Sequence, residues 1–416
     1  LVVSSASTTS SDSVQALGGN DTVIGTNGGD IVDLGSGNDS LSTAGSYSGG
    51  TVLGGSGNDT IQLPSGFISS LVDGQGDNDS INLSGSSSTV SLSTISGGSG
   101  SDTLLFAGDL LSSSVFGGSS SVTSTDGADS LSVAGSLSAS FLQGNAGADT
   151  FNVVGVVKAS SSVRGGQDGD FVSIVGSVTS SFVAGDAGSD TIVLTAGAIS
   201  SSIYGGSLTD TTNDSADSLV FSAGATASFI QGNAGSDTFQ IAGLTNSSSV
   251  RGGRDNDNIA LLAGGVASSW ISGDLGSDTL SSTGLVLQSS IYGGSLEDTT
   301  ADGEDSISLT AGVAQSLIQG NAGADTINFA GGFSQSSVLG GAAADLISIS
   351  GVVSQSLISG DLGNDTLQVG EAAGNTITQA TIFGGSSADA TNSGNDSLVI
   401  QGRLVNSTVY GGDGAD

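Results

Sequence analysis

Apolar and polar residues alternate in short segments that recur along the whole chain. Phe151 and Val153 enclose one polar residue, and Phe239 and Ile241 do the same 88 residues later. A period of two places the apolar side chains on one face of a β-strand. A further column of Val, Ile or Leu lies two residues before each glycine-containing turn. The pattern therefore predicts two short strands per repeat and a narrow apolar core that continues from one repeat to the next.

A glycine-rich turn that closes on an aspartate separates these strands. The segment Gly144-Asn145-Ala146-Gly147-Ala148-Asp149 returns in nearly the same form at 232–237 and 320–325, so its closing aspartates are 88 residues apart. Glycine permits φ > 0 and close approach of two backbones, which a tight turn requires. Looser copies lie between, mostly 20 or 21 residues apart, with a longer step of 27 residues in each cycle and of 31 residues in the last one. Four coils of about 20 residues thus form one super-repeat of about 88 residues, as in a stacked solenoid. The closing aspartates are Asp59, Asp79, Asp102, Asp129, Asp149, Asp170, Asp190, Asp217, Asp237, Asp257, Asp278, Asp305, Asp325, Asp345, Asp365, Asp396 and Asp416.

The sequence repeat is shorter at the beginning of the chain. Asp12, Asp21, Asp30 and Asp39 are nine residues apart, within segments such as Leu17-Gly18-Gly19-Asn20-Asp21-Thr22-Val23-Ile24. These segments resemble the RTX (hemolysin-type) calcium-binding nonapeptide G-G-x-G-x-D-x-U-x. The resemblance implies a right-handed parallel β-roll with two nonapeptides per coil. It also implies Ca²⁺ between successive turns on the same side, with Asp carboxylates and turn carbonyls as ligands. We call these four residues and the closing aspartates above the ladder aspartates.

The expected fold is an all-β, right-handed parallel β-roll or β-solenoid without helices. Residues 1–60 follow the nonapeptide pattern and are expected to form a β-roll. Residues 61–416 are expected to form an extended β-solenoid of 20-residue coils, with one longer turn loop in every fourth coil. Within this solenoid the aspartate turns continue along a single edge, whereas the opposite edge has Ser-rich corners such as 159–162 and 246–249.

Two further sets of acidic residues are candidate ligands. The second residue of the turn cycles through Asn, Gly, Asp and Gly, and its acidic members are Asp186, Asp274 and Asp361. Either these carboxylates bind additional cations, or the column only reflects a left-handed backbone, which Gly, Asn and Asp tolerate.

The longer turns carry the second set. Asp210, Asp214 and Asp217 have the same spacing as Asp298, Asp302 and Asp305, four residues and then three. This spacing suits another hard cation with oxygen ligands, and a solvated acidic loop is the alternative.

Charge and composition narrow the function. The net charge is −35, from 40 acidic and 5 basic residues. Carboxylates stacked about 5 Å apart need neutralisation, which favours multiple Ca²⁺ ions as cofactors. The acidity excludes nucleic acid as a partner, and no apolar run is long enough to span a membrane. The chain lacks His and Cys, so it offers no Ser-His-Asp or Cys-His pair and no usual zinc ligands, and we expect no enzymatic activity.

Large apolar residues alternate with Ser or Thr three residues before the turn, on the face expected to point outward. The large members are Phe141, Phe182, Phe229, Trp270, Leu317 and Leu357. An apolar column on a hydrophilic surface indicates either a contact with another molecule or side chains that a twist of the corner folds into the core.

The chain also resembles RTX repeat proteins of bacterial and cyanobacterial surface layers and cell surfaces. The resemblance implies a structural, calcium-dependent extracellular protein at the cell surface that assembles with copies of itself into a sheet or filament. We also expect it to be the ordered portion of a longer protein. A cell-surface polysaccharide is a further candidate partner. The alternative is the extender or ice-binding module of a large calcium-dependent adhesin, although Phe171 and Leu346 interrupt the row of Thr, Ser and Asn that an ice-binding face requires.

Overall fold

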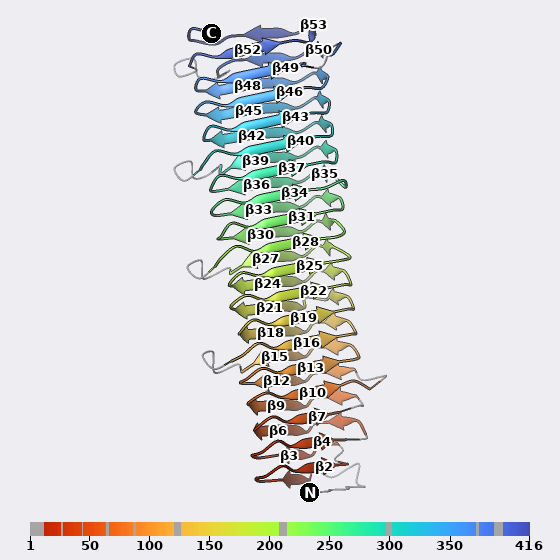
Figure 1. Cartoon of the computed structure of the whole chain (residues 1–416). Coiled ribbons are helices and arrows are strands. Elements are labelled where there is room, and N and C mark those ends of the chain that lie inside the picture. The colour runs from red at the N-terminus through yellow and green to blue at the C-terminus, as the bar shows by residue number, and fades with distance from the viewer. Residues whose placement is uncertain are drawn as a thin grey trace. The chain divides into compact units, whose positions relative to one another are not determined.

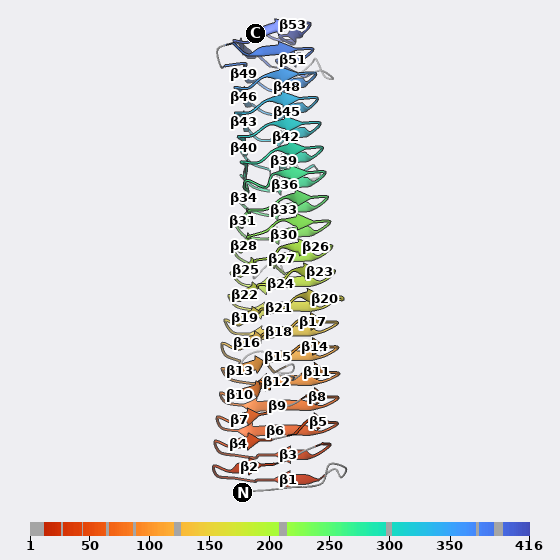
Figure 2. The same ribbon diagram turned by 90° about the vertical axis from the view of Figure 1, so that its right-hand side faces the viewer.

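The computed structural model describes residues 12–25, 28–43, 45–63, 66–85, 89–119, 126–207, 214–296, 302–371, 374–386 and 394–416. The chain divides into two compact units, Leu1–Asp214 and Ser215–Asp416, which are described separately below. Every regular element among the described residues is a β-strand, and within each unit successive coils stack in parallel (Figure 1 and Figure 2). No helix long and apolar enough to cross a membrane occurs in the described ranges. The predicted parallel β-solenoid is confirmed.

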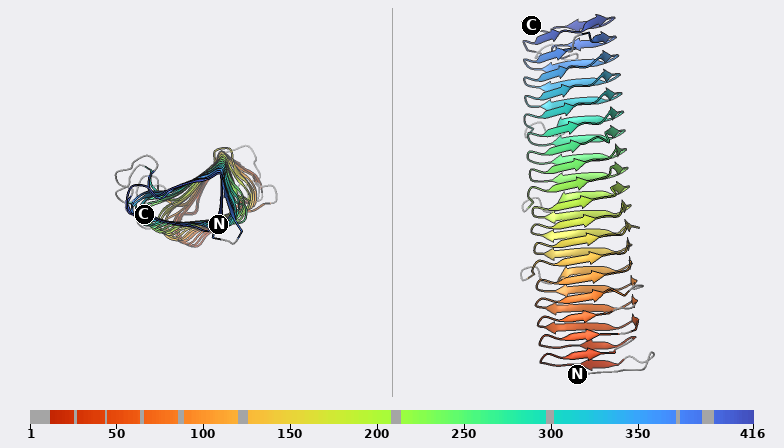
Figure 3. Two further views of the ribbon diagram at one scale, coloured as in Figure 1. Left: turned by 90° about the horizontal axis from the view of Figure 1, so that it is seen from above. Right: turned by 45° about the vertical axis from the view of Figure 1, so that its right-hand side comes forward.

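Each coil is three-sided and has three strands (Figure 3). The prediction of two strands per coil was therefore wrong, because the third strand is mostly two residues long, too short to show a period. Sheet A carries the strand that leads into the turn, sheet B the strand after the ladder aspartate, and sheet C the short third strand.

Sheet A has the longest strands. In the first unit these are β1 (Ser13–Gln15), β3 (Ile31–Asp33), β6 (Thr51–Ser56), β9 (Leu71–Gly76), β12 (Thr94–Gly98), β15 (Ser114–Gly118), β18 (Phe141–Ala146), β21 (Ser162–Gln167), β24 (Phe182–Ala187) and β27 (Ser202–Gly206). In the second unit they are β30 (Phe229–Asn233), β33 (Ser249–Gly253), β36 (Trp270–Asp274), β39 (Ser290–Gly294), β42 (Leu317–Ala322), β45 (Ser337–Ala342), β48 (Leu357–Leu362), β51 (Thr381–Phe383) and β54 (Thr408–Tyr410).

Sheet B has strands of three or four residues. In the first unit these are β2 (Thr22–Ile24), β4 (Ser40–Ser42), β7 (Thr60–Gln62), β10 (Ser80–Leu83), β13 (Thr103–Phe106), β16 (Ser130–Val133), β19 (Thr150–Val153), β22 (Phe171–Ile174) and β25 (Thr191–Leu194). In the second unit they are β28 (Ser218–Phe221), β31 (Thr238–Ile241), β34 (Asn258–Leu261), β37 (Thr279–Ser282), β40 (Ser306–Leu309), β43 (Thr326–Phe329), β46 (Leu346–Ile349), β49 (Thr366–Val369) and β52 (Ser397–Ile400).

Sheet C closes the coil. In the first unit its strands are β5 (Tyr47–Ser48), β8 (Phe67–Ile68), β11 (Val90–Ser91), β14 (Leu110–Leu111), β17 (Leu137–Ser138), β20 (Val157–Lys158), β23 (Val178–Thr179) and β26 (Ala198–Ile199). In the second unit they are β29 (Ala225–Thr226), β32 (Thr245–Asn246), β35 (Val266–Ala267), β38 (Val286–Leu287), β41 (Val313–Ala314), β44 (Phe333–Ser334), β47 (Val353–Ser354), β50 (Thr376–Thr378) and β53 (Arg403–Val405).

The register follows the sequence repeat. Ser13 pairs with Ile31 and Thr22 with Ser40, at a separation of 18 residues, which corresponds to two nonapeptides per coil. From Ile31, which pairs with Thr51, the separation becomes 20 residues or more. The division into compact units lies elsewhere in the chain and does not test the domain boundary expected at residue 60. That boundary stays a prediction.

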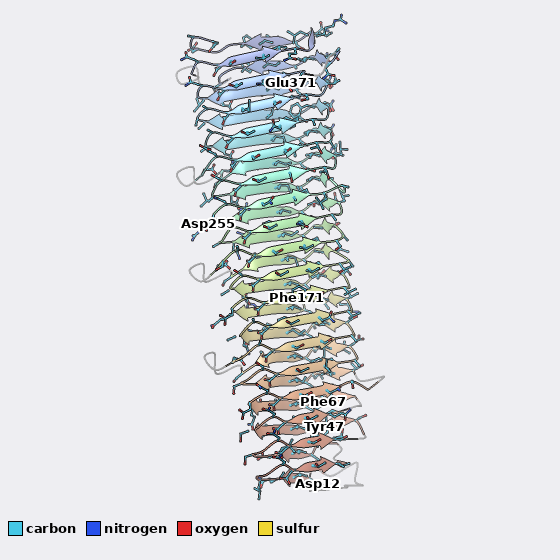
Figure 4. The ribbon with its side chains drawn as sticks, viewed as in Figure 1. Asp12, Tyr47, Phe67, Phe171, Asp255 and Glu371 are labelled. Carbon is cyan, nitrogen blue, oxygen red and sulfur yellow. The ribbon has the colours of Figure 1, made fainter. Side chains whose placement is uncertain are left out.

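The core is narrow, with one or two inward side chains per strand. The inward residues of all three sheets are buried, as Leu142 of β18, Phe151 of β19 and Val157 of β20 show within one coil. Near the beginning of the chain, Tyr47 and Phe67 stack with ring centroids 5.8 Å apart, and both are labelled in Figure 4. Because each coil covers its apolar residues only with adjacent coils, stability depends on nearest-neighbour contacts.

A row of buried serines crosses the corner between sheets C and A, and we call it the Ser ladder. Its members are Ser70, Ser93, Ser113, Ser140, Ser161, Ser181 and Ser201 in the first unit, and Ser228, Ser248, Ser269, Ser289, Ser316, Ser336 and Ser356 in the second. The backbone N–H of one ladder serine donates to the Oγ of the next, for example Ser316 to Ser336 at 3.1 Å. The same Oγ donates to the carbonyl two residues earlier, as Ser336 does to Ser334 at 2.7 Å. The sequence showed this edge to be Ser-rich but not that its hydroxyls bond the coils together.

We predict that Ser336→Ala loosens the coils locally. It leaves the buried N–H of Ser316 without its acceptor, a loss of about 1–3 kcal/mol for a buried donor. Hydrogen exchange of residues 316–356 should rise, whereas Ser337→Ala, on the outward side of β45, should change it little. Equal protection in both variants would contradict a structural role for the Ser ladder.

Candidate metal centre

Except for Asp12 and Asp30, which precede strands of sheet A, the ladder aspartates lie between the turn and sheet B, and their side chains point into the coil. Nearly all are buried; Asp149 and Asp237, for example, are each only 1% exposed. One carboxylate oxygen, Oδ1, accepts the backbone N–H of the ladder aspartate one coil earlier. The N···O distance is 2.8 Å from Asp129 to Asp149 and also 2.8 Å from Asp217 to Asp237. The ladder therefore connects successive coils through the carboxylates themselves.

The nonapeptide region has two such rows. Asp12 donates to Asp30 on one edge, and Asp21 donates to Asp39 on the other. Only the row that contains Asp21 and Asp39 continues as carboxylates, where the backbone N–H of Asp39 donates to Asp59 at 2.8 Å. In the first row the register places Gly50 and then Ser70 after Asp30, where the Ser ladder begins. The edge that loses its aspartates thus replaces a carboxylate acceptor by a hydroxyl.

The second carboxylate oxygen, Oδ2, is buried without a hydrogen-bond partner in nearly every coil. This holds for the ladder residues Asp21, Asp39, Asp59, Asp79, Asp102, Asp129, Asp149, Asp170, Asp190, Asp217, Asp237, Asp257, Asp278, Asp305, Asp325, Asp345, Asp365 and Asp396. Asp12 and Asp416, in the outermost coils, are exposed. A buried polar atom with no partner is strongly destabilising, so a repeated row of them indicates a missing positive ligand.

The first glycine of each turn makes room for this oxygen. A side chain at Gly144 would overlap Oδ2 of Asp149, and it would also meet the carbonyl oxygen of Gly165 in the next coil. The same arrangement recurs at Gly232, with Asp237 and Gly252. Carboxylate and carbonyl oxygens therefore face one small space between two turns, which is the donor set that Ca²⁺ prefers.

Burial favours the protonated form of these carboxylates unless a cation is present. Desolvation raises the pKa of Asp149 to about 8, that of Asp129 to about 9 and that of Asp257 to about 10. Neighbouring carboxylates raise the pKa further, since Asp237 and Asp278 act on Asp257 from the adjacent coils. A divalent cation would restore the ionised form by supplying the compensating charge.

No three acidic side chains meet at one point among the described residues. Each site in the ladder therefore has to combine one or two carboxylates with backbone carbonyls. The turn provides those carbonyls because its glycines bring successive backbones close together.

The second-position aspartates lie outside this row. Asp186, Asp274 and Asp361 have φ of 76°, 74° and 71°, so the left-handed backbone predicted for this column is present. Asp186 forms an ion pair with Arg164, with Nη2 and Oδ1 2.6 Å apart. Asp274 and Asp361 instead accept hydrogen bonds from Ser272 and Ser359. Their role as metal ligands stays a prediction.

The long turns bring a further carboxylate onto the outer face of sheet A. Asp302 lies over Gly294, where any side chain would overlap its carboxylate, and Asp214 lies over Gly206 in the same way. The carboxylate of Asp302 accepts the N–H of Ala322 at 3.1 Å through Oδ2, whereas its Oδ1 is buried without a hydrogen-bond partner. Asp210 and Asp298 lie outside the described residues.

Asp126 occupies the corresponding place over Gly118 in the first long turn. Its Oδ2 is buried and has no hydrogen-bond partner, yet the sequence did not identify it as a candidate ligand. The signal was an aspartate three residues before the ladder aspartate, together with glycine as the second residue of the turn.

This fold and this ladder define a β-solenoid of calcium-binding repeats. The family model of the RTX calcium-binding nonapeptide repeat matches the chain in four copies, within residues 7–41, 45–62 and 308–335. The chain thus carries RTX repeats, as its turns indicated. No curated protein matches. Among solved structures, the chain is similar to a hyperactive, Ca²⁺-dependent, β-helical antifreeze protein from an Antarctic bacterium, with 16% identity, a TM-score of 0.38 and coverage of 88% of this chain and 85% of that one.

We predict that Asp237→Ala disrupts the fold locally. The change removes the acceptor of the Asp217 N–H and one candidate ligand, while distant coils keep their own neighbours. Hydrogen exchange should rise near residues 217–257 and stay low near 345–365. The exposed Asp255, in the turn of the next coil, provides the control Asp255→Asn. Uniform loss of protection along the second unit would contradict a nearest-neighbour ladder.

We also predict that the metal-free fold is more stable at low pH than at neutral pH. The folded-state pKa of many ladder carboxyls is raised above the unfolded value near 3.9, from about 6 at Asp59 to about 10 at Asp257. Their protonated form therefore stabilises the metal-free fold fully below about pH 4, and this stability is lost as the pH rises through the raised values. In EGTA, circular dichroism should show more β-structure at pH 5 than at pH 8, and millimolar Ca²⁺ should restore it at pH 8. Equal β-structure in EGTA at both pH values would contradict the burial of these carboxylates.

Proposed function

We propose that the chain is a calcium-dependent structural protein of an extracellular surface layer or fibril. The observation that carries this proposal is the row of buried Oδ2 atoms, one per coil, beside turn carbonyls. Cations in this row hold the coils at a fixed rise and give a stiff, regular element. Several Ca²⁺ ions, one for each pair of adjacent turns, are the proposed occupants.

The thin core makes calcium necessary for folding. Each coil buries only a few apolar side chains, and 70 of the 416 residues are glycine, which loses the most conformational freedom on folding. Ca²⁺ that binds only the folded ladder adds its binding free energy to the stability. Extracellular calcium modules bind at about 10⁻⁴–10⁻³ M, which fits a protein that folds after secretion. RTX repeats are typical of secreted proteins, and placement at the cell surface belongs to the proposal.

The outward face of sheet A supplies a surface for assembly. In the second unit the register aligns Phe229, Ser249, Trp270, Ser290, Leu317, Ser337 and Leu357 in one column. These side chains are half-buried, so they are neither core residues nor freely exposed. The ring of Trp270 lies 4.4 Å from that of Tyr292, and the Arg251 guanidinium lies 6.0 Å from the Trp270 ring. Large and small side chains thus alternate along the column, and a copy of the chain with the same rise can match that alternation.

We predict that the double variant Phe229→Ser and Trp270→Ser folds with calcium but assembles poorly. Serine already occupies this column in the alternate coils, so the backbone accepts it. Circular dichroism with Ca²⁺ should match the unchanged chain, whereas sedimentation and negative-stain imaging should show fewer sheets or filaments. Assemblies that form as readily as before would contradict the lateral contact.

An ice-binding or extender module is the second candidate function. The observation in its favour is the row of hydroxyl side chains that begins the strands of sheet B, such as Thr238, Thr279 and Thr326. Phe171, labelled in Figure 4, is 42% exposed in the corresponding position of β22, and Leu346 interrupts the row in the second unit. A measurement of thermal hysteresis separates the two functions, since a structural protein should show none.

A further inference from the structure

The corner before each ladder serine holds an exposed residue with a left-handed backbone. In the second unit these residues are Ala227, Ser247, Ser268, Gln288, Gln315, Gln335 and Gln355, and Gln379 and Asn406 occupy the same corner before Ala380 and Ser407, all with φ between 49° and 53°. Glycine adopts this conformation without strain, yet none of these corners uses it. The corner therefore keeps a side chain in every one of these coils, and that side chain points to solvent.

From residue 288 to residue 379 this side chain is glutamine in five successive coils, and we call these residues the Gln ladder. Nε2 of Gln315 donates to Oε1 of Gln335 at 3.3 Å, and Nε2 of Gln335 donates to Oε1 of Gln355 at 3.2 Å. The amide of Gln335 thus uses one N–H and one lone pair along the row. It therefore keeps a second N–H and a second lone pair for a partner from solvent.

A groove of about 490 Å³ lies along this row. Gln335, Gln355 and Gln379 line it, together with Ser337, Leu357 and Thr381 of sheet A and the ladder serines Ser336 and Ser356. The lining contains no charged side chain, although the chain as a whole has a net charge of −35. The groove thus offers paired donors and acceptors at intervals of one coil, with an apolar side chain beside them.

We propose that this groove binds a neutral, linear polysaccharide. Each sugar hydroxyl both donates and accepts, as each amide does, and a polymer repeats its hydroxyls at a regular interval as the Gln ladder repeats its amides. Leu357 provides an apolar contact for the C–H face of a sugar ring. A charged polymer would lose hydration here without gaining an opposite charge.

This binding site is separate from the calcium ladder, although its residues Ser337 and Leu357 also belong to the column proposed for assembly. The Gln ladder follows the corner between sheets C and A, whereas the carboxylates follow the turn between sheets A and B. A variant of the corner can therefore change binding while calcium-dependent folding stays intact.

The test is a depletion assay with the full chain in millimolar Ca²⁺. Insoluble cellulose and chitin are the neutral probes, and calcium-gelled alginate is the acidic one. We expect at least one neutral polymer to deplete the protein from solution and alginate to deplete much less. Gln335→Ser with Gln355→Ser introduces the residue present at Ser247 and Ser268, and it should weaken binding at least tenfold without changing the circular dichroism.

The matched control makes the same chemical change on sheet B, with Gln240→Ser and Gln368→Ser, and should bind as the unchanged chain does. Three outcomes would overturn the proposal: no depletion by either neutral polymer, equal depletion by alginate, or unchanged binding of the Gln335/Gln355 variant. If that variant instead loses assembly with no effect on glycan binding, the groove is a contact between copies of the chain and the proposal is wrong.

Discussion

Buried carboxylates that face one another across successive turns are the constraint on which the rest of this structure depends. Each ladder aspartate must enter the coil for its Oδ1 to accept the N–H of the previous coil, which places Oδ2 out of reach of water. The first glycine of the turn follows from this geometry, because a Cβ at Gly144 or Gly232 would occupy the space of that oxygen. A bound cation that compensates the charge of the carboxylates is then needed to keep the row ionised at neutral pH. The composition of the turn and the need for a cation are thus two consequences of one arrangement.

The Ser ladder shows what the same architecture requires when the charge is removed. Asp12 and Asp30 begin a second carboxylate row, and the register continues this row through Gly50 to Ser70 and the serines that follow. A serine Oγ accepts the N–H of the adjacent coil as Oδ1 does, and its hydroxyl proton finds a carbonyl within the same coil. Among the described residues, no ladder serine has an Oγ that is buried without a hydrogen-bond partner. The structure therefore has a row of carboxylates on one edge and a row of hydrogen-bonded serines on the other.

The sequence predicted the fold well because a solenoid repeats its geometry wherever it repeats its residues. The spacing of Asp149, Asp237 and Asp325 was enough to place the ladder and the 88-residue super-repeat. The third strand of each coil was not predicted, because a strand of two residues such as Val157 and Lys158 shows no period. The ion pair of Arg164 with Asp186 and the position of Asp126 over Gly118 depend on how adjacent coils face each other, which spacing along one chain does not contain. The sequence indicated which edge carries the row of carboxylates but not what holds the other edge together.

The two kinds of corner place opposite demands on the sequence, and this separates folding from surface recognition. At the calcium turn the space above the backbone is filled by a carboxylate, so the position is restricted to glycine. At the serine corner the left-handed residue faces solvent, and Ala227, Ser247 and Gln335 all occupy it with nearly the same φ. Because the hydrogen bonds of that corner come from the following serine, its exposed residue can change without loss of the ladder. A continuous run of glutamines at a position so free to vary therefore favours the surface contact proposed above, in addition to the amide hydrogen bonds between coils.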